Sequence, residues 1–269
     1  MNQQTRHLIL QKLFWSKFGF RLLRFYLGFA RRWEYAVMNR SLLAEVNGEY
    51  WIIKFMPQEP FVLDAGFNRG DFSSEILKQR FKAKIIGFEP AKSMQQLFQM
   101  NFDNETRIQL LPFALSNVSG EMDFCDTADG GSSLATDNTA GNHYRIKTVS
   151  LDDIAKANNY PQINMLKIDV EGYDLHVLEG ASGLLDEQRI DIFTFEYNAP
   201  WIDSRRFLKE ACAYIATKPY SLFRLFNGFL APFRYNHAAE RHDLGCNYIG
   251  ISTNRLQRGD FPIKSFPLY

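Results

Sequence analysis

The chain has 269 residues, 46% of them hydrophobic, which is enough to bury the core of one large α/β domain. Its 31 basic and 30 acidic residues give a net charge of +1, which offers no support for a nucleic-acid partner. The three cysteines form no C-x-x-C pair, which argues against a disulfide framework or a zinc site. No apolar run approaches the roughly 18 residues of a membrane span, and residues 8–10 are too short for a signal peptide. We therefore expect a cytoplasmic protein.

The first forty residues carry eight basic residues and only one acidic residue, Glu34. Aromatic and aliphatic residues recur there every three or four positions, which predicts a helix with an apolar stripe opposite a cationic face. We interpret residues 1–45 as a basic amphipathic helical extension. Its stripe would pack on the protein's own domain or on a second subunit, or the helix would lie on an anionic membrane surface. The stripe consists of Phe14, Phe18, Leu22, Phe25, Phe29 and Trp33.

Residues 46–269 predict one α/β domain, because short apolar runs alternate with amphipathic stretches from Phe61 onward. The last two runs lack a crossover helix between them, which predicts an antiparallel hairpin at the edge of a mainly parallel, seven-stranded sheet. A short extra strand is expected at 121–124, and the polar stretch 126–145 is interpreted as a loop near the site. The seven expected strands cover residues 61–66, 85–89, 108–115, 165–170, 191–197, 220–226 and 247–252.

The segment Asp64-Ala-Gly66-Phe-Asn-Arg-Gly70 lies where the first expected strand turns into a helix. Gly66 would let a ligand approach the backbone, and Gly70 would relieve crowding at the helix start. The pattern lacks the middle glycine of the dinucleotide fingerprint, and Asp64 precedes it. A carboxylate attracts the ammonium and sulfonium of S-adenosylmethionine but repels a diphosphate. The turn therefore favours an adenosylmethionine site over a nicotinamide site.

Two further acidic positions fit such a site. Glu89 ends the second expected strand, near the offset at which an acidic residue accepts hydrogen bonds from ribose hydroxyls. Lys167, Asp169 and Glu171 close the fourth strand at the carboxyl edge of the sheet, where ligands of open α/β sheets bind. We expect Asp169 and Glu171 to border the cofactor and the acceptor. Lys167 would pair with a neighbouring carboxylate.

The chain resembles the FkbM family of methyltransferases over about residues 60–200. The resemblance is carried by residues 61–70, by Gly87-Phe-Glu-Pro90, by Ala114-Leu-Ser116 and by Leu166-Lys-Ile-Asp-Val-Glu-Gly-Tyr-Asp174 with 177–181. Phe67 stands where the family usually has a small residue, and Arg69 where it often has an apolar one. The resemblance implies a Rossmann-like class I methyltransferase domain with S-adenosylmethionine as cofactor. The expected cofactor-binding residues are Asp64, Ala65, Gly66, Phe67, Asn68, Gly70, Glu89, Pro90, Ala114, Leu115 and Asp169.

The family implies O-methylation of a hydroxyl on a sugar or a secondary metabolite, with no obligatory metal, so we expect no metal ligands. A general base would remove the acceptor's proton, and His237, His242 and Glu171 are the candidates. Three alternatives stay open. They are N-methylation, a nicotinamide-dependent oxidoreductase, and an inactive scaffold that keeps the fold.

Overall fold

The computed structural model describes residues 5–6, 17–37, 39, 43–127, 133–134, 141–242 and 245–265. The chain divides into two compact units, Met1–Ser41 and Leu42–Tyr269. The predicted boundary between residues 45 and 46 stays a prediction. The first unit contains helix α2 (Lys17–Val37), and the second contains all the sheets.

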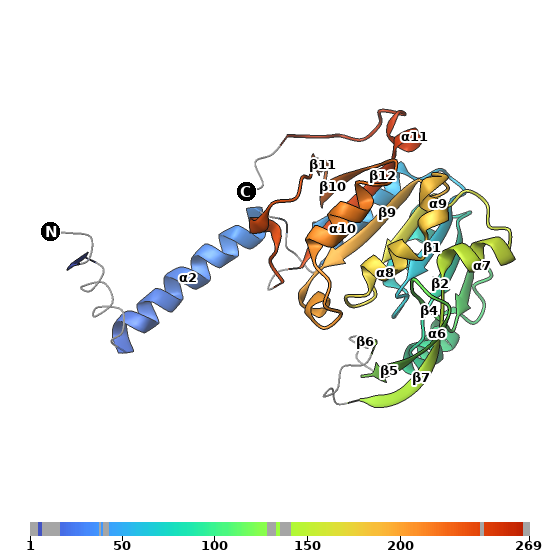
Figure 1. Ribbon diagram of the computed structural model, residues 1–269, viewed down its shortest axis with the longest axis horizontal. Helices are drawn as coiled ribbons and strands as arrows, with labels where there is room; N and C mark the ends of the chain where they lie inside the picture. Colours follow the sequence, from blue (N-terminus) through green and yellow to red (C-terminus); the bar gives the residue numbers. More distant parts are fainter. Residues whose placement is uncertain are drawn as a thin grey trace. The chain divides into compact units, whose positions relative to one another are not determined.

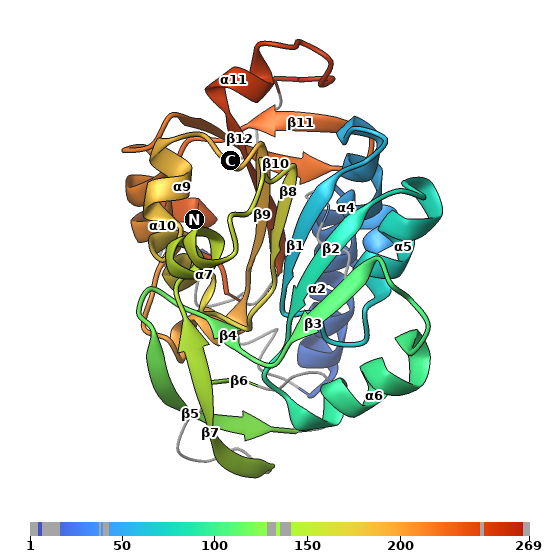
Figure 2. The ribbon, with the colours of Figure 1, turned by 90° about the vertical axis from the view of Figure 1, so that its right-hand side faces the viewer.

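The main sheet of the second unit has eight strands in the order β11-β10-β12-β9-β8-β1-β2-β3 (Figures 1 and 2). Strands β3, β2, β1, β8 and β9 are parallel to one another, whereas each pairing of β9 with β12, β12 with β10 and β10 with β11 is antiparallel. The strands are β1 (Phe61–Ala65), β2 (Lys84–Phe88), β3 (Ile108–Leu111), β8 (Met165–Ile168), β9 (Ile192–Tyr197), β10 (Tyr220–Phe226), β11 (Phe229–Pro232) and β12 (Cys246–Ser252).

Helices cover both faces of this sheet, with α7, α9 and α10 on one side and α4, α5 and α6 on the other (Figure 2). Successive strand residues alternate between two core clusters, so that Leu63 and Leu166 face one layer while Val62 and Met165 face the other. The helices are α3 (Ala44–Asn47), α4 (Glu49–Ile52), η1 (Ile53–Phe55), α5 (Asp71–Gln79), α6 (Lys92–Phe102), α7 (Leu151–Ala157), α8 (Asp174–Glu179), α9 (Ser182–Asp186), η2 (Ala199–Ile202), α10 (Leu208–Ile215), η3 (His237–Ala239) and α11 (Thr253–Leu256).

A second sheet, in the order β4-β7-β5-β6, lies beside the main one (Figure 2). It contains β4 (Ala114–Leu115), β5 (Gly120–Asp126), β6 (Ser133–Leu134) and β7 (Asn142–Val149). The prediction of a loop over residues 126–145 is therefore wrong at three places. Residue 126 ends β5, residues 133–134 form β6, and residues 142–145 begin β7. Strand β7 escaped prediction because its first residues are polar and exposed. Residues 128–132 and 135–140 of that predicted loop lie outside the described residues.

The predicted fold class, a Rossmann-like α/β domain with a C-terminal antiparallel hairpin, is confirmed. The predicted count of seven strands is wrong by one, because β11 adds an eighth strand at the edge. This strand is only four residues long and ends in Pro232, a residue that sheets tolerate at their edges. The predicted third strand also divides, since β3 stays in the main sheet while β4 joins the second sheet.

Helix α2 carries several large apolar side chains on its surface. Phe25 is 70% exposed, Trp33 is 61% exposed, and Phe29 packs edge to face on Trp33 at 6.0 Å between ring centroids. Among the described residues, no helix has both the length and the apolar character required to cross a membrane. A helix is thus present at 17–37, within the predicted extension, and it carries exposed apolar side chains.

The strand order reverses between β1 and β8, since the chain continues from β1 to β2 on one side and returns as β8 on the other. In open α/β sheets, ligands bind at the carboxyl ends of the strands at such a switch point. Gly66 follows β1 and Asp169 follows β8, so both lie at this position. The fold places the site there.

Candidate functional site

The turn after β1 is shaped by two glycines with left-handed backbone angles. Gly66 has φ +80°, and a Cβ on it would lie 1.8 Å from the Asp169 carbonyl oxygen. Gly70 has φ +79°, and a Cβ there would lie 2.6 Å from the Phe67 ring. The backbone amides of Gly66 and Phe67 both donate to the Phe88 carbonyl at 3.1 Å, which ties the turn to β2. Both positions therefore require glycine.

Glu89, directly after β2, is held by the backbone. Its Oε1 accepts a hydrogen bond from the Ala91 amide and its Oε2 from the Asn68 amide, both at 2.8 Å. The side chain is only 6% exposed, and burial raises the pKa of Glu89 to about 7 despite these two donors. Each oxygen keeps a further lone pair, so this carboxylate can accept hydrogen bonds from a vicinal diol.

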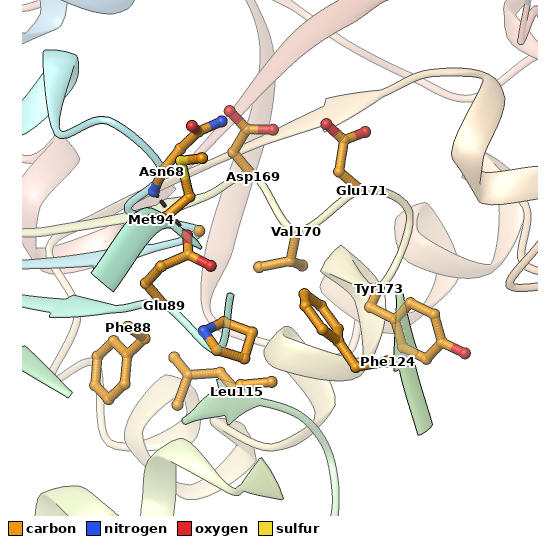
Figure 3. Close-up of a pocket in the computed structure, with 13 residues that line it drawn as sticks. Asn68, Phe88, Glu89, Met94, Leu115, Phe124, Asp169, Val170, Glu171 and Tyr173 are labelled. Atoms are coloured by element: carbon orange, nitrogen blue, oxygen red, sulfur yellow. Dashed lines mark hydrogen bonds between the residues drawn. The ribbon is translucent and has the colours of Figure 1, made fainter. Parts of the chain in front are cut away.

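A cavity that is partly open to solvent lies at the switch point, with a volume of about 630 Å³ that includes this open space. Asn68, Asp169 and Glu171 lie along one side, and Phe88, Leu115 and Phe124 lie on the other, with Glu89 between (Figure 3). We call it the adenosine cavity, because an apolar slot beside a fixed carboxylate fits an adenine ring and a ribose. Its walls are Gly66, Asn68, Phe88, Glu89, Pro90, Met94, Ala114, Leu115, Phe124, Asp169, Val170, Glu171 and Tyr173.

Most of the expected cofactor residues line this cavity, namely Gly66, Asn68, Glu89, Pro90, Ala114, Leu115 and Asp169. Ala65 and Gly70 do not, since Ala65 is the last residue of β1 and Gly70 precedes α5. Phe67 does not line it either, because its ring is buried against Phe98 and Phe102 at centroid distances of 5.5 and 5.7 Å. Instead of changing the cavity floor, Phe67 fills the layer between the sheet and α6.

Asp64 is also absent from the walls of the adenosine cavity and is only 1% exposed. The Ser73 hydroxyl of α5 donates to its Oδ2 at 2.7 Å, and its Oδ1 is buried without a hydrogen-bond partner among the described residues. Burial raises the pKa of Asp64 to about 6, although the nearby Lys167 ammonium acts in the opposite direction. The predicted direct contact of Asp64 with the cofactor stays a prediction, and this placement does not favour it.

Lys167 has the pairing partner that the sequence predicted. Its Nζ lies 2.9 Å from Asp169 Oδ2. Burial opposes the charge of the lysine, but Asp169 and Asp64 outweigh it and hold the pKa of Lys167 above its usual range. Glu171, in a left-handed conformation with φ +50°, lines the adenosine cavity. It is the candidate base that the structure brings to the site.

The two histidine candidates lie elsewhere. His237 is exposed in η3 and its Nδ1 is 3.3 Å from the Tyr235 hydroxyl. His242 Nε2 is 2.7 Å from the Tyr197 hydroxyl, which also donates to Glu240. Neither histidine is among the described residues that line the cavity, so their proposed role as base receives no support from this geometry.

Glu196, near the end of β9, is an acidic residue that the sequence analysis missed. Its Oε2 accepts a hydrogen bond from the Asn198 amide group at 2.9 Å. Burial and the charges of Asp169, Glu49 and Glu171 raise the pKa of Glu196 to about 7. Its position could have identified it, because Glu196 is the penultimate residue of a buried strand that runs to the edge of the sheet where ligands bind. Asp169 and Glu171 were recognised by a related position, just after β8.

A second cavity adjoins the first and shares Gly66, Asn68 and Asp169 with it. It is wider, about 1480 Å³ by the same measure, and it opens between the turn after β1 and helices α3 and α4. We call it the outer cavity. Its charged walls are Glu45, Glu49, Arg69, Asp71, Glu75, Lys78, Lys167 and Asp169. In the described part of the chain, no three His, Cys, Asp or Glu side chains gather as a metal site would require.

Comparison with known proteins identifies the family. The model of the methyltransferase FkbM domain matches residues 64–222, more than half of the chain. The protein belongs to the FkbM methyltransferase family. It is accordingly a methyltransferase, and its methyl donor is S-adenosylmethionine, as the sequence predicted. This finding removes the nicotinamide-dependent oxidoreductase from the alternatives.

Two individual relatives are each 26% identical to this chain over the matched residues. Hexuronic acid methyltransferase AglP of Haloferax volcanii is 26% identical over 177 residues, which cover 63% of this chain and 71% of AglP. The 2-O-methyltransferase NoeI of Sinorhizobium fredii is 26% identical over 157 residues, 52% of this chain and 64% of NoeI. The crystal structure of methyltransferase FkbM from Methylobacillus flagellatus matches 71% of this chain and 44% of its own, with 15% identity and a TM-score of 0.46.

Proposed function

We propose that this enzyme methylates a hydroxyl group of a sugar or a related small metabolite. The observation that carries the proposal is the pair of carboxylates, Asp169 and Glu171, in the wall of the adenosine cavity. Their charges also act on a third carboxylate, Glu196. Carboxylates accept hydrogen bonds from hydroxyl groups and can take up a proton. The names of the two relatives, a hexuronic acid methyltransferase and a 2-O-methyltransferase, support the same acceptor class.

The adenosine cavity fits the nucleoside of the cofactor. Glu89 would accept hydrogen bonds from the ribose hydroxyls, and Phe88, Leu115 and Phe124 would enclose the adenine. When bound, S-adenosylmethionine supplies an electrophilic methyl group for in-line displacement. The protein's own residues then orient the acceptor oxygen and remove its proton.

Two carboxylates are candidates for the base. Glu171 lines the cavity. Glu196 lines neither cavity, but it is close enough for the charges of Asp169 and Glu171 to act on it, and its pKa is raised to about 7, close to the value at which a general base works best near neutral pH. Asp169 is a weaker candidate because Lys167 already pairs with it at 2.9 Å. We propose Glu196 as the main base and Glu171 as a contact of the acceptor.

An acceptor screen tests this function. The full chain is incubated with S-adenosylmethionine and separate panels of neutral sugars, uronic acids, phenols and amines, and methylated products are detected by mass spectrometry. Methylation of a hydroxyl panel is expected. Methylation of amines alone would establish the N-methyltransferase alternative, and binding of S-adenosylhomocysteine without turnover on any panel would favour the inactive scaffold.

For helix α2 we propose contact with an anionic membrane surface, and a cytoplasmic location for the protein. The exposed aromatic side chains Phe25, Phe29 and Trp33, in a segment with many cations, support it. Sedimentation with vesicles that contain anionic lipid, compared with a chain lacking residues 1–40, tests this. Loss of self-association rather than of vesicle binding on deletion would indicate a homo-oligomer contact instead.

A further inference from the structure

The outer cavity contains a carboxylate that lies outside the family match. Glu49 is the first residue of α4, whereas the match covers residues 64–222. Both amide groups that hold it also lie outside the match. Asn47 Nδ2 and Asn247 Nδ2 donate to Glu49 Oε1 at 2.9 and 2.8 Å. Oε2 has no hydrogen-bond partner among the described residues, so one oxygen of a fixed carboxylate remains available.

The charge of Glu49 acts on a polar cluster at one edge of four adjacent strands, where β1, β8 and β9 end and the antiparallel β12 begins. Asp64 of β1, Lys167 of β8, Glu196 of β9 and Asn247 of β12 each lie an even number of positions from a residue of the same core cluster, so the four side chains share one face of the sheet. The charge of Glu49 acts on Asp64, Lys167 and Glu196 alike. The cluster has four carboxylates, those of Glu49, Asp64, Asp169 and Glu196, and one lysine, Lys167. The negative charge of the carboxylates would therefore attract a further cation.

The other carboxylates of the outer cavity are less suited to bind that cation. Asp169 is paired with Lys167, and Glu75 accepts hydrogen bonds from Lys78 and Gln79 at 3.1 and 2.9 Å. Asp64 lines neither cavity. Glu45 on α3 and Asp71 at the start of α5 are exposed. Glu49 alone among them combines a fixed position, an available oxygen and a place in the cavity wall.

We propose that Glu49 Oε2 binds the α-ammonium of the methionine part of the cofactor, with Asn247 as its positioning residue. This rests on the proposed function. A nucleoside held by Glu89 in the adenosine cavity would extend its amino acid past Gly66, Asn68 and Asp169, the residues that both cavities share. The ammonium then reaches the outer cavity, where a carboxylate with two amide donors on one oxygen stabilises it.

Calorimetric binding of two ligands to the full chain tests the proposal. S-adenosylhomocysteine contains the amino acid, whereas 5′-methylthioadenosine has the same nucleoside thioether without it. Glu49→Gln should weaken binding of S-adenosylhomocysteine about ten- to a hundredfold, the range for a hydrogen bond to a charged group. Binding of 5′-methylthioadenosine should change by less than about twofold, because that ligand has no ammonium.

Two further variants complete the test. Glu45→Gln removes an equal charge from the outer rim and should change either affinity by less than about twofold. Asn247→Ala should weaken S-adenosylhomocysteine by about three- to tenfold, since Glu49 loses one of its two amide donors. Equal weakening of both ligands by Glu49→Gln, or unchanged binding of S-adenosylhomocysteine, would overturn the proposal. A wild-type chain that binds neither ligand would instead refute the proposed cofactor site.

Discussion

The adenosine cavity takes all its walls from residues 66–173, within the family match, and is lined largely by apolar side chains. The outer cavity is wider, and Glu45 and Glu49 contribute charged side chains to its wall from outside the match. We propose that the first region holds the nucleoside of the cofactor and that the second holds its amino-acid part. The two regions therefore predict different effects for substitutions in their walls.

Gly66 belongs to both cavities, so its substitution should have the largest effect. Gly66→Ala places a Cβ 1.8 Å from the Asp169 carbonyl oxygen at φ +80°. We expect binding of both test ligands to fall below detection, and stability to fall by about 2–4 kcal/mol. Calorimetry and urea unfolding measure the two effects. Gly228→Ala, with φ +102° but open space around it, is the matched control for backbone strain alone.

Glu196 lines neither cavity, and its substitution should affect turnover more than cofactor binding. We expect Glu196→Gln to lower kcat by about a hundredfold or more, the usual contribution of a general base, with little change in affinity for S-adenosylhomocysteine. In the wild type, kcat should rise with pH up to about 7 as Glu196 loses its proton. The variant should lack this rise. A kcat that keeps the same pH profile in the variant would assign the proton transfer to another group.

Glu89 lies in the adenosine cavity, and its substitution should affect both ligands equally. Glu89→Ala removes the carboxylate that faces the ribose, so affinity for S-adenosylhomocysteine and for 5′-methylthioadenosine should each fall about ten- to a hundredfold. This is the opposite of the selective effect expected for Glu49→Gln. A loss confined to S-adenosylhomocysteine would mean that the two cavities have been assigned to the wrong halves of the cofactor.

The pH dependence of binding should be the smallest effect. Ribose hydroxyls donate to an ionised carboxylate, and burial raises the pKa of Glu89 to about 7 in the free protein. Affinity for 5′-methylthioadenosine should therefore fall by at most about tenfold per pH unit below that value and be constant above it.

Stability of the free protein should move in the opposite direction. Because folding raises the pKa of Glu89 from 4.5 to about 7, the folded state binds more protons between these values. The contribution of this group to stability is present at low pH and is lost as pH rises through that window. Asp64 and Glu196 have the same sign, with pKa values raised to about 6 and 7. Chemical unfolding across this range, in the absence of ligand, measures the slope.

The sequence predicted the adenosine cavity better than the outer cavity for a physical reason. Gly66, Glu89 and Asp169 follow buried strands, and parallel strands bring their carboxyl ends together whatever the details of packing. The exact contacts of Asp64 could not be predicted, because its burial depends on Ser73 of α5. The positions of His237 and His242 could not be predicted for a similar reason, since residues in a long connection can lie on either side of the site.

The outer cavity needed the tertiary structure. Asn247 and Glu49 are 198 positions apart, and no local pattern in the sequence relates them. Strand β11 and the polar first half of β7 were missed because short or half-exposed strands give weak periodic signals. Phe67 shows the limit of motif comparison. The ring of an unusual residue in a family motif can pack in the core instead of lining the adenosine cavity.

The hydrogen bond from Asn247 to Glu49 also bears on how the enzyme matures. Every wall of the adenosine cavity is present once residue 173 has been synthesised, whereas Asn247 belongs to the last strand of the main sheet to be made. During translation, a nascent chain would gain its nucleoside contacts long before Glu49 is fixed. Full cofactor affinity would thus arise only after β12 has been made, so that the ligand favours chains that include β12 over shorter ones.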